Sequence, residues 1–545
     1  MTQPTAVGMD TEYGIVEIGA TGIDPIRASR RLFLHYESLG VRAVPHRDAL
    51  IVSMGDDPEL EWPRLADSGD DSLVPACDAP GRAAACDWML ANGARYYIDH
   101  AHPEYATPEC HSIKTLVAAD KAGELLLERC LHAASRGGAP IRLYKNNSDH
   151  KGVSWGCHEN YCITAELFEE LVYTASPRLS QLVLPFLVTR TIFCGAGKVG
   201  GELEAGPAGF QLSQRADFIE TLTGPQTTYL RPLFNQRDEA HADERRVRRL
   251  HMIAGDANMA EFSTYLKFGI TRIFLRMLGD GFIGADLALA DPVAGMRTVS
   301  RDLTFQAQLP LRNGNFRSAV DIQEQIAGFA ERYLDDRGGS EEEWDVLDNW
   351  LDAIEALRTD WRKLSGSLDW AIKRSLLERY LAAQNSSWDQ VADWQPIVET
   401  ALRRQNGVPE SLTANVRAAD LADQRDIYFA LRRMDLEYHD IRRGPGEAET
   451  GLFYRLQDRG AVSRVVTDAE IAHLVNNPPT GSRASWRGAL IASYPNSIYS
   501  ADWSCVSVAT RHGRRLIRFN EVGTEAASMG ETLCSSAESQ TKCGG

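Results

Sequence analysis

One stretch, residues 92–109, constrains the fold and the chemistry of this chain more than any other. It opens with an Asn-Gly pair, which is turn chemistry, and continues into Tyr-Tyr-Ile, which has strand propensity. Asp99, His100, His102 and Glu104 then place four titratable side chains within six residues. A carboxylate at the end of a strand, beside two imidazoles and a second carboxylate, is costly to leave unpaired. We therefore interpret Asp99 as a nucleophile or base and Glu104 as a metal ligand. The alternative is a surface turn with solvated charges.

A second acidic pattern lies near the N-terminus. Residues 6–16 are predicted to form the first strand, and alternation puts Asp10 and Glu12 on one face, roughly 7 Å apart. Two carboxylates that point the same way repel each other unless a cation lies between them. Hard oxygen ligands favour Mg²⁺, usually shared with nucleotide phosphates. The alternative is an exposed edge strand with two solvated acids.

Two later segments add polar groups. Residues 154–164 are predicted to form a strand with His158 and Asn160 on one face. A lone histidine is more often structural than a ligand, so both interpretations of His158 stay open. Residues 231–261 combine acids and histidines with a run of arginines, which bind phosphates in a bidentate way. For Glu244–Arg249 alone, the alternative is a solvated, charged helix.

The bulk properties narrow the class of protein. A chain of 545 residues is too long for one ordinary core, so two domains, or one large and one small, are expected. The net charge of −17 argues against general nucleic-acid binding but allows a local basic groove. The best apolar run, Leu182–Val188, has the length of a strand and not of a membrane span. The N-terminus lacks the basic and apolar regions of a secretion signal, and the cysteines contain no Cys-x-x-Cys pair. Reduced thiols in the cytoplasm are expected.

Hydrophobic periodicity divides the rest of the chain. The segment 41–84 is rich in Asp, Pro and Gly and is expected to be a long mobile loop. Residues 182–193 form an apolar core segment, either strand or helix, and residues 385–430 are polar and partly helical. A distinct module begins at Leu436, and the Ser/Gly-rich end of the chain is expected to be disordered. Helices are predicted over residues 27–40, 113–135, 263–279, 316–335, 341–364 and 367–384.

These motifs, in this order, resemble the Pup ligase/depupylase family, whose members share the carboxylate–amine ligase fold of glutamine synthetase. The resemblance covers most of the chain from residue 6 to about residue 505. It implies an α+β fold, a glutamine synthetase-like curved antiparallel sheet cradle packed with helices, over residues 1–435. It also implies a small C-terminal domain, 436–510, followed by a poorly matched tail, 511–545, that is expected to be disordered. The matching stretches are Gly8–Ile15, Asn92–Glu109, Tyr144–Asn147, His158–Tyr161, Leu184–Arg190, Gln211–Arg215, Arg237–Asp243, Arg249–Glu261, Tyr438–Arg442 and Pro478–Gly488.

The resemblance also implies an activity. The family contains a ligase, which joins the C-terminal glutamate of the small modifier Pup to lysines, and a depupylase, which deamidates Pup and removes it from substrates. Residues 99–105 look like the depupylase version, and the segment 41–84 resembles a loop that the ligase lacks. The chain is therefore expected to be an ATP- and Mg²⁺-dependent depupylase and Pup deamidase. The ligase, a non-catalytic Pup- or nucleotide-binding regulator, and a small-molecule carboxylate–amine ligase stay open as alternatives.

Site roles follow from the same resemblance. Asp99 would attack the side-chain carbonyl of the Pup terminus or activate water for that attack, with ATP, or ADP with phosphate, and Mg²⁺ as cofactors. The metal would be held by Asp10, Glu12, Glu104, His158 and His241. The phosphates would be bound by Arg215, Arg237, Arg249, Arg483 and Arg487, and the supporting residues would be Tyr97, His102 and Asn160. The first metal acid is usually Glu in this family and is Asp10 here. The partners would be Pup, which is acidic, and pupylated proteins, with no nucleic acid and no membrane, and the chain would be a monomer.

Overall fold

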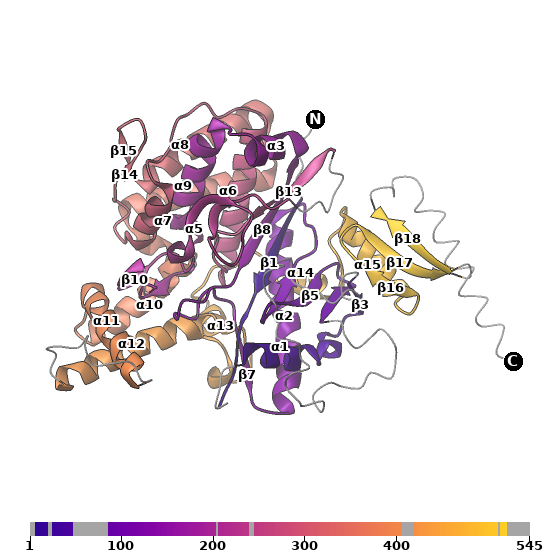
Figure 1. The fold of residues 1–545 in the computed structure, drawn as a ribbon, viewed down its shortest axis with the longest axis horizontal. Coiled ribbons are helices and arrows are strands. Elements are labelled where there is room, and N and C mark those ends of the chain that lie inside the picture. Colours follow the sequence, from indigo (N-terminus) through magenta and orange to yellow (C-terminus); the bar gives the residue numbers. More distant parts are fainter. Residues whose placement is uncertain are drawn as a thin grey trace.

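A computed structural model describes residues 6–19, 24–46, 86–202, 205–238, 245–405, 418–510 and 513–519. Most of the expected 41–84 loop, the predicted metal ligand His241 and the end of the chain after residue 519 lie outside these ranges. The described residues form a central sheet with a thick helical layer, and a small module of strands stands to one side of it (Figure 1). The α+β fold class is confirmed.

The central sheet is seven-stranded, in the order β13-β8-β1-β6-β5-β4-β3, and each neighbouring pair is antiparallel. The predicted first strand, 6–16, is in fact two, because the chain leaves the sheet at Tyr13 and β2 (Gly14–Glu17) pairs with β7 (Ile141–Tyr144). The strands of the central sheet are β1 (Val7–Glu12), β3 (Ala43–Pro45), β4 (Asp87–Leu90), β5 (Arg95–Asp99), β6 (His102–Ala106), β8 (Cys157–Thr164) and β13 (Val247–Met252).

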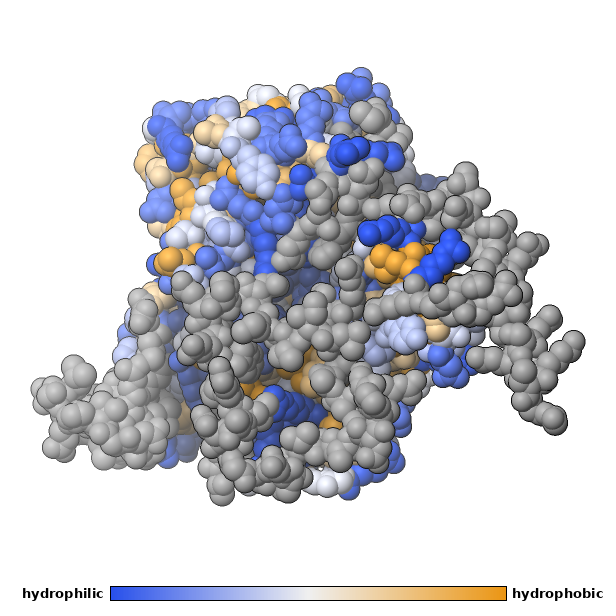
Figure 2. All heavy atoms as spheres, turned by 45° about the vertical axis from the view of Figure 1, so that its right-hand side comes forward, coloured by the Kyte–Doolittle hydropathy of each residue, from blue (hydrophilic) through white to orange (hydrophobic). Residues whose placement is uncertain are grey.

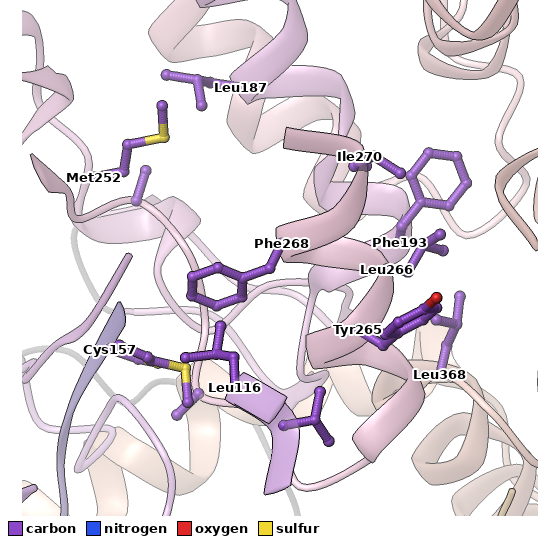
Figure 3. Packing of buried hydrophobic residues seen from close by; sticks show 14 of the residues in the cluster. Leu116, Cys157, Leu187, Phe193, Met252, Tyr265, Leu266, Phe268, Ile270 and Leu368 are labelled. Atoms are coloured by element: carbon purple, nitrogen blue, oxygen red, sulfur yellow. The ribbon is translucent and has the colours of Figure 1, made fainter. Parts of the chain in front are cut away.

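One face of this sheet is covered by two long helices, α2 (Ile113–Arg136) and α6 (Glu261–Gly279). A Cβ at Gly123 of α2 would lie 2.4 Å from the Tyr105 ring, so helix and strand approach closely only because this residue is glycine. Phe268 reaches from α6 toward Leu116 of α2 and Cys157 of β8 (Figure 3). The opposite face of the sheet is therefore left for polar side chains.

The helical layer confirms the predicted helices at 113–135, 263–279, 316–335 and 367–384 to within a few residues. The helix predicted over 341–364 is observed as α9 (Glu341–Thr359) followed by a 3₁₀ turn. The helix predicted over 27–40 is observed as α1 (Pro25–Phe33), also followed by a 3₁₀ turn. Residues 182–193 are helical, not strand. The other helices are α1 (Pro25–Phe33), α3 (Ala165–Tyr173), α4 (Leu184–Thr189), α5 (Thr191–Cys194), α7 (Pro292–Arg301), α8 (Ala319–Arg337), α9 (Glu341–Thr359), α10 (Asp369–Ala383), α11 (Trp388–Gln405), α12 (Ala418–Tyr438), α13 (Leu452–Asp458), α14 (Asp468–Asn476) and α15 (Arg483–Ser493).

Hydrophilic side chains predominate over the part of the surface that is coloured in Figure 2, in keeping with the net charge of −17. None of the helices in the described ranges is long and apolar enough to cross a membrane.

The short strands outside the central sheet are β9 (Lys198–Val199), β10 (Phe210–Gln211), β11 (Thr221–Gly224), β12 (Pro232–Asn235), β14 (Leu309–Pro310) and β15 (Phe316–Arg317).

The small module consists of α15 and a three-stranded sheet, β16 (Ile498–Ala501), β17 (Cys505–Thr510) and β18 (Gly513–Arg518). It has its own apolar cluster, which includes Val44 and Met89 from the edge of the central sheet. The prediction of a disordered tail from residue 511 is wrong for β18, which pairs with β17 along its whole length. The predicted boundary at residue 436 does not coincide with a change of core, because α14 contributes Ile471 and Leu474 to the main cluster.

Candidate active site

The polar face of the central sheet gathers side chains that are far apart in the sequence. Partners in an antiparallel pair point to the same face, so the register decides which residues meet. Glu12 of β1 pairs with Glu104 of β6, and Asp10 pairs with His158 of β8. On the other side of β6, Tyr97 of β5 pairs with Glu104 and Asp99 pairs with His102. The residues that the sequence predicted for the catalytic and metal site therefore converge, apart from His241, which lies outside the described ranges.

Two groups of ligand atoms lie close enough to hold cations. Atoms of Asp10, Glu104 and His158 lie within 4.8 Å of one another, and so do atoms of Glu12, Asp99 and Glu104. Glu104 belongs to both groups and joins them into one cluster, which we call the acidic cluster: Asp10, Glu12, Asp99, Glu104 and His158. Asp99 thus faces the acids of β1 across β6.

The electrostatics of the acidic cluster fit a divalent cation. Burial raises the pKa of Glu104 well above its usual value, and the nearby carboxylates of Asp99, Glu12 and Asp10 raise it further. Oε2 of Glu104 is buried and accepts no hydrogen bond from the described residues. Burial lowers the pKa of His158, which favours the neutral imidazole that ligates metals. A cation among these atoms would relieve the repulsion and ligate the orphaned oxygen, and an oxygen-rich donor set suits Mg²⁺.

Glu12 is fixed from two sides. The backbone N–H of Gly156 donates to Oε1 of Glu12 at 2.9 Å, and Nδ1 of His102 lies 3.5 Å from Oε2. The His102 ring in turn packs against Trp155, with ring centroids 4.8 Å apart. His102 is thus packed between Trp155 and Glu12.

Asp99 lies at the end of β5, where a tight turn leads into β6. The next residue, His100, has a φ of 51° in the left-handed region, and its Nδ1 lies 3.0 Å from Oδ1 of Asp99. Burial would raise the pKa of Asp99, but the hydrogen bond and positive charge of His100 outweigh this effect and lower it. About a third of the Asp99 side chain is exposed (36%). The carboxylate is thus anionic and can be reached by a substrate.

Two arginines beside the cluster form a basic site. Arg215 is fully buried, and its guanidinium donates to Oγ of Ser154 and to the carbonyls of Trp155 and Ile253. Arg231 donates to the Ser154 carbonyl from the other side. Burial, and then the charge of Arg231, lowers the pKa of Arg215 to about 10.

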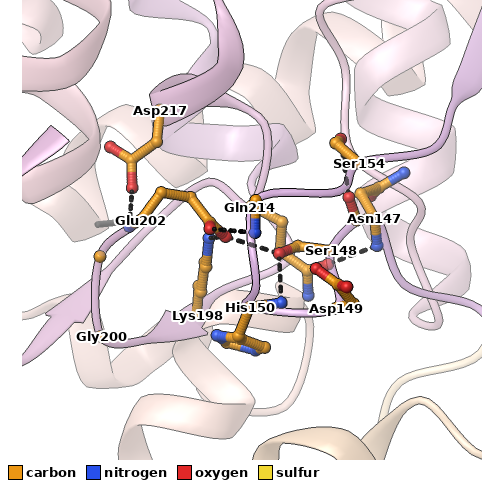
Figure 4. Close-up of polar contacts among 12 residues, drawn as sticks. Asn147, Ser148, Asp149, His150, Ser154, Lys198, Gly200, Glu202, Gln214 and Asp217 are labelled. Atoms are coloured by element: carbon orange, nitrogen blue, oxygen red, sulfur yellow. Dashed lines mark hydrogen bonds and ion pairs between the residues drawn. The ribbon is translucent and has the colours of Figure 1, made fainter. Parts of the chain in front are cut away.

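No carboxylate of the described residues lies within ion-pair distance of Arg215 or Arg231, although the more distant charge of Glu12 acts on the pKa of both. Two positive charges therefore converge without a direct salt bridge, as at an anion site. Ser154 is held in place by the Asn147 carbonyl, within a wider polar network (Figure 4). Arg231 is not among the residues predicted from the sequence. Its only signal was its position at the start of the polar stretch 231–261.

The other predicted phosphate ligands have different surroundings. Arg249 of β13 donates to Oδ1 of Asn160 at 3.0 Å, on the same face as the acidic cluster. Arg237 follows β12, and its backbone N–H donates to Asn235. Arg483 and Arg487 lie on α15, where both form ion pairs with Glu109, at 3.4 and 2.7 Å. Arg487 is fully buried and also donates to the Gly93 carbonyl, so it ties the small module to the turn before β5.

Comparison with known proteins identifies the family of the chain. The family described as "Pup-ligase protein" matches residues 5–433 and 410–507. A depupylase from Acidothermus cellulolyticus is 36% identical over 506 residues, which cover 92% of this chain and 90% of the relative. A Pup deamidase/depupylase from Mycolicibacterium smegmatis is 34% identical with the same coverage. A Pup–protein ligase from Mycolicibacterium vanbaalenii is 39% identical over a shorter stretch, 428 residues, which cover 76% of this chain and 82% of the relative.

Two solved structures of a Pup ligase have the same fold as this chain. The ligase PafA in a complex with Pup resembles this chain with a TM-score of 0.72 and 27% identity, and the match covers 98% of this chain and 93% of the other. The Pup ligase PafA in complex with ADP resembles it with a TM-score of 0.67 and 31% identity, over 83% of this chain and 90% of the other. With the family matched along most of its length and a depupylase more than a third identical to it, the chain belongs to the Pup-ligase family.

Proposed function

We propose that this chain is a nucleotide- and Mg²⁺-dependent depupylase that cleaves the isopeptide bond between Pup and substrate lysines, and that also deamidates a C-terminal glutamine of Pup. The observation that carries the proposal is the position of Asp99. An anionic, partly exposed carboxylate lies within 4.8 Å of the Glu12 and Glu104 carboxylates and points into the same polar face.

The residues of the chain have distinct parts in this chemistry. Asp99 attacks the side-chain carbonyl of the Pup terminus, or takes a proton from the water that attacks it. A carboxylate nucleophile divides one difficult hydrolysis into two easier steps. His100 keeps Asp99 charged and oriented through the 3.0 Å contact at Nδ1. The leaving group is ammonia in the deamidation and the lysine amine in the depupylation.

The acidic cluster and the two arginines account for the cofactors. Asp10, Glu12, Glu104 and His158 would hold the metal, while Arg215 and Arg231 would bind nucleotide phosphates. Mg²⁺, held there together with the nucleotide phosphates, would supply positive charge and polarisation where negative charge develops on the carbonyl oxygen. We assign Arg483 and Arg487 to a structural role, because both already form ion pairs with Glu109.

Coverage favours the depupylase over the ligase. The depupylase relatives match 92% of the chain, while the ligase relative matches 76%, although its identity over that stretch is higher. The ligase is therefore the second candidate. The partners would be Pup and pupylated proteins, and the site would work as a monomer because one chain supplies all of its residues. Every cysteine that the structure describes is a free thiol, in keeping with a cytoplasmic location.

The test is incubation of the protein with a Pup–substrate conjugate, Mg²⁺ and ATP. We expect release of free Pup and of unmodified substrate. Asp99→Asn should abolish release and leave nucleotide affinity largely unchanged, while Asp348→Asn, an exposed acid on α9, should behave like the wild type. A parallel reaction with Pup ending in Glu, a lysine-bearing protein and ATP measures ligation. Conjugate formation without cleavage would establish the ligase, and a nucleotide-bound wild type inert in both reactions would refute the catalytic proposal.

A further inference from the structure

Asn160 of β8 connects the acidic cluster to the edge strand β13. Its Nδ2 donates to Oδ2 of Asp10 at 2.9 Å. Its Oδ1 accepts from Nη1 of Arg249 at 3.0 Å and lies 2.9 Å from Nδ1 of His251. Asn160 and His251 are direct partners in the register of β8 and β13, while Asn160 and Asp10 are diagonal neighbours on β8 and β1. One carboxamide thus spans three strands.

The orientation of this carboxamide is fixed by its partners. A guanidinium only donates hydrogen bonds, so the atom that faces Arg249 must be the oxygen, and the NH₂ group must face Asp10. Nδ1 of His251 lies 2.9 Å from the same oxygen and 3.4 Å from Nη1 of Arg249, so an imidazole that is protonated on Nδ1 donates to the carboxamide. The His251 ring also packs edge-on against His158, with centroids 4.8 Å apart. Residues of β13 therefore orient two members of the acidic cluster.

Asp10 needs such orientation more than its neighbours do. Glu12 and Glu104 extend one methylene further from their strands, and Glu12 is already fixed by Gly156 and His102. One oxygen of the shorter Asp10 carboxylate lies within 4.8 Å of ligand atoms of Glu104 and His158. The hydrogen bond from Asn160 holds Oδ2 and so limits the rotation of the whole carboxylate.

We propose that Asn160 is a positioning residue that aims the Asp10 carboxylate at the cation, and that Arg249 and His251 hold Asn160 for this purpose. The inference rests on the proposed cation site, and it assigns these three residues to metal binding, not to contact with the Pup chain. Partners of this kind typically contribute a factor of about 10 to 100 in metal affinity.

A double-mutant cycle with Asp10→Glu tests this role, because a glutamate carries its carboxylate one methylene further and depends less on Asn160. The readout is Mn²⁺ affinity in the presence of ADP, measured by electron paramagnetic resonance without Pup. We expect Asn160→Ala to weaken Mn²⁺ binding about tenfold beside Asp10 and only about twofold beside Asp10→Glu. Asn476→Ala, an exposed asparagine on α14, is the matched control and should bind Mn²⁺ like the wild type.

An equal loss in both backgrounds, or no loss beside Asp10, would overturn the proposal. If Asn160→Ala does not fold, Asn160→Ser serves in its place, since its hydroxyl is too short to span the strands. The proposed function is judged separately, by release of Pup from a conjugate. A wild type that binds Mn²⁺ but releases no Pup would refute the depupylase and leave the positioning role to be decided by the cycle alone.

Discussion

Replacing Gly156 with alanine is expected to disable the metal site without unfolding the chain. A Cβ at Gly156 would lie 2.1 Å from Nε2 of His158, where ordinary contact begins at 3.4 Å. The imidazole would have to move by about 1.3 Å, and the fold can absorb this at small cost because the clash is with the end of a side chain and not with backbone. A misplacement of about 1 Å at a catalytic group can cost about 100-fold in rate, or about 2.7 kcal/mol.

The assay compares Mn²⁺ affinity, conjugate cleavage and melting temperature for Gly156→Ala and a matched control, Gly284→Ala. Gly284 is exposed, and a Cβ there meets nothing within 4 Å. We expect Gly156→Ala to lose about 100-fold in cleavage at a nearly unchanged melting temperature, and the control to match the wild type. Full affinity and cleavage in a folded Gly156→Ala protein would refute the reasoning, since His158 would then not be a ligand.

Three further predictions concern arginines. Arg231→Met should weaken ADP binding by about 10- to 100-fold, since a charge-assisted hydrogen bond contributes about 1.5–3 kcal/mol. Calorimetry measures the ADP affinity, and an unchanged affinity would contradict the phosphate role of Arg231. Arg487→Met removes the closer of the two arginines that pair with Glu109 and the donor to the Gly93 carbonyl, so limited proteolysis should release the small module while ADP affinity stays unchanged. A large loss of ADP affinity with the module still docked would restore the phosphate role. Burial would raise the pKa of Glu159, but Arg190 holds it below its usual value. Arg190→Met should therefore lower the free energy of unfolding, measured in urea, by about 3–5 kcal/mol at pH 7. The loss should be smaller toward pH 5, because the unpaired Glu159 carboxyl takes up a proton there. The same loss at both pH values would contradict this reasoning.

The sequence predicts which side chains share a strand face better than it predicts which strands lie side by side. Alternation along one strand was enough to place Asp10 and Glu12 on a common face and Asp99 at a strand end, because a strand has a fixed period of two. The long helices were equally accessible, since their apolar spacing and the serine caps at 318 and 340 are local signals.

Features that depend on long-range contacts could not be predicted in this way. Which strand lies beside β1 is decided by pairing over about 150 residues, so the contact between Asn160 and Asp10 has no local signature. Arg231 and Gly156 matter only because of what lies next to them in space. Arg487 shows the opposite difficulty: its place in a matching motif predicts phosphate binding, whereas its ion pair with Glu109, which has no local signature, favours the structural role that we propose.

β8 shows why the site and the core cannot vary independently. His158 and Asn160 face the acidic cluster, while Glu159 and Tyr161 face the core, where Arg190 binds Glu159 through both of its terminal nitrogens. A slip of one residue would turn Glu159 into the acidic cluster and bury His158 among apolar side chains. The buried ion pair opposes that slip, because neither partner tolerates burial without the other. The ion pair of Arg190 and Glu159 on the buried face of the sheet thus helps to hold the mutually repelling carboxylates of the polar face in register.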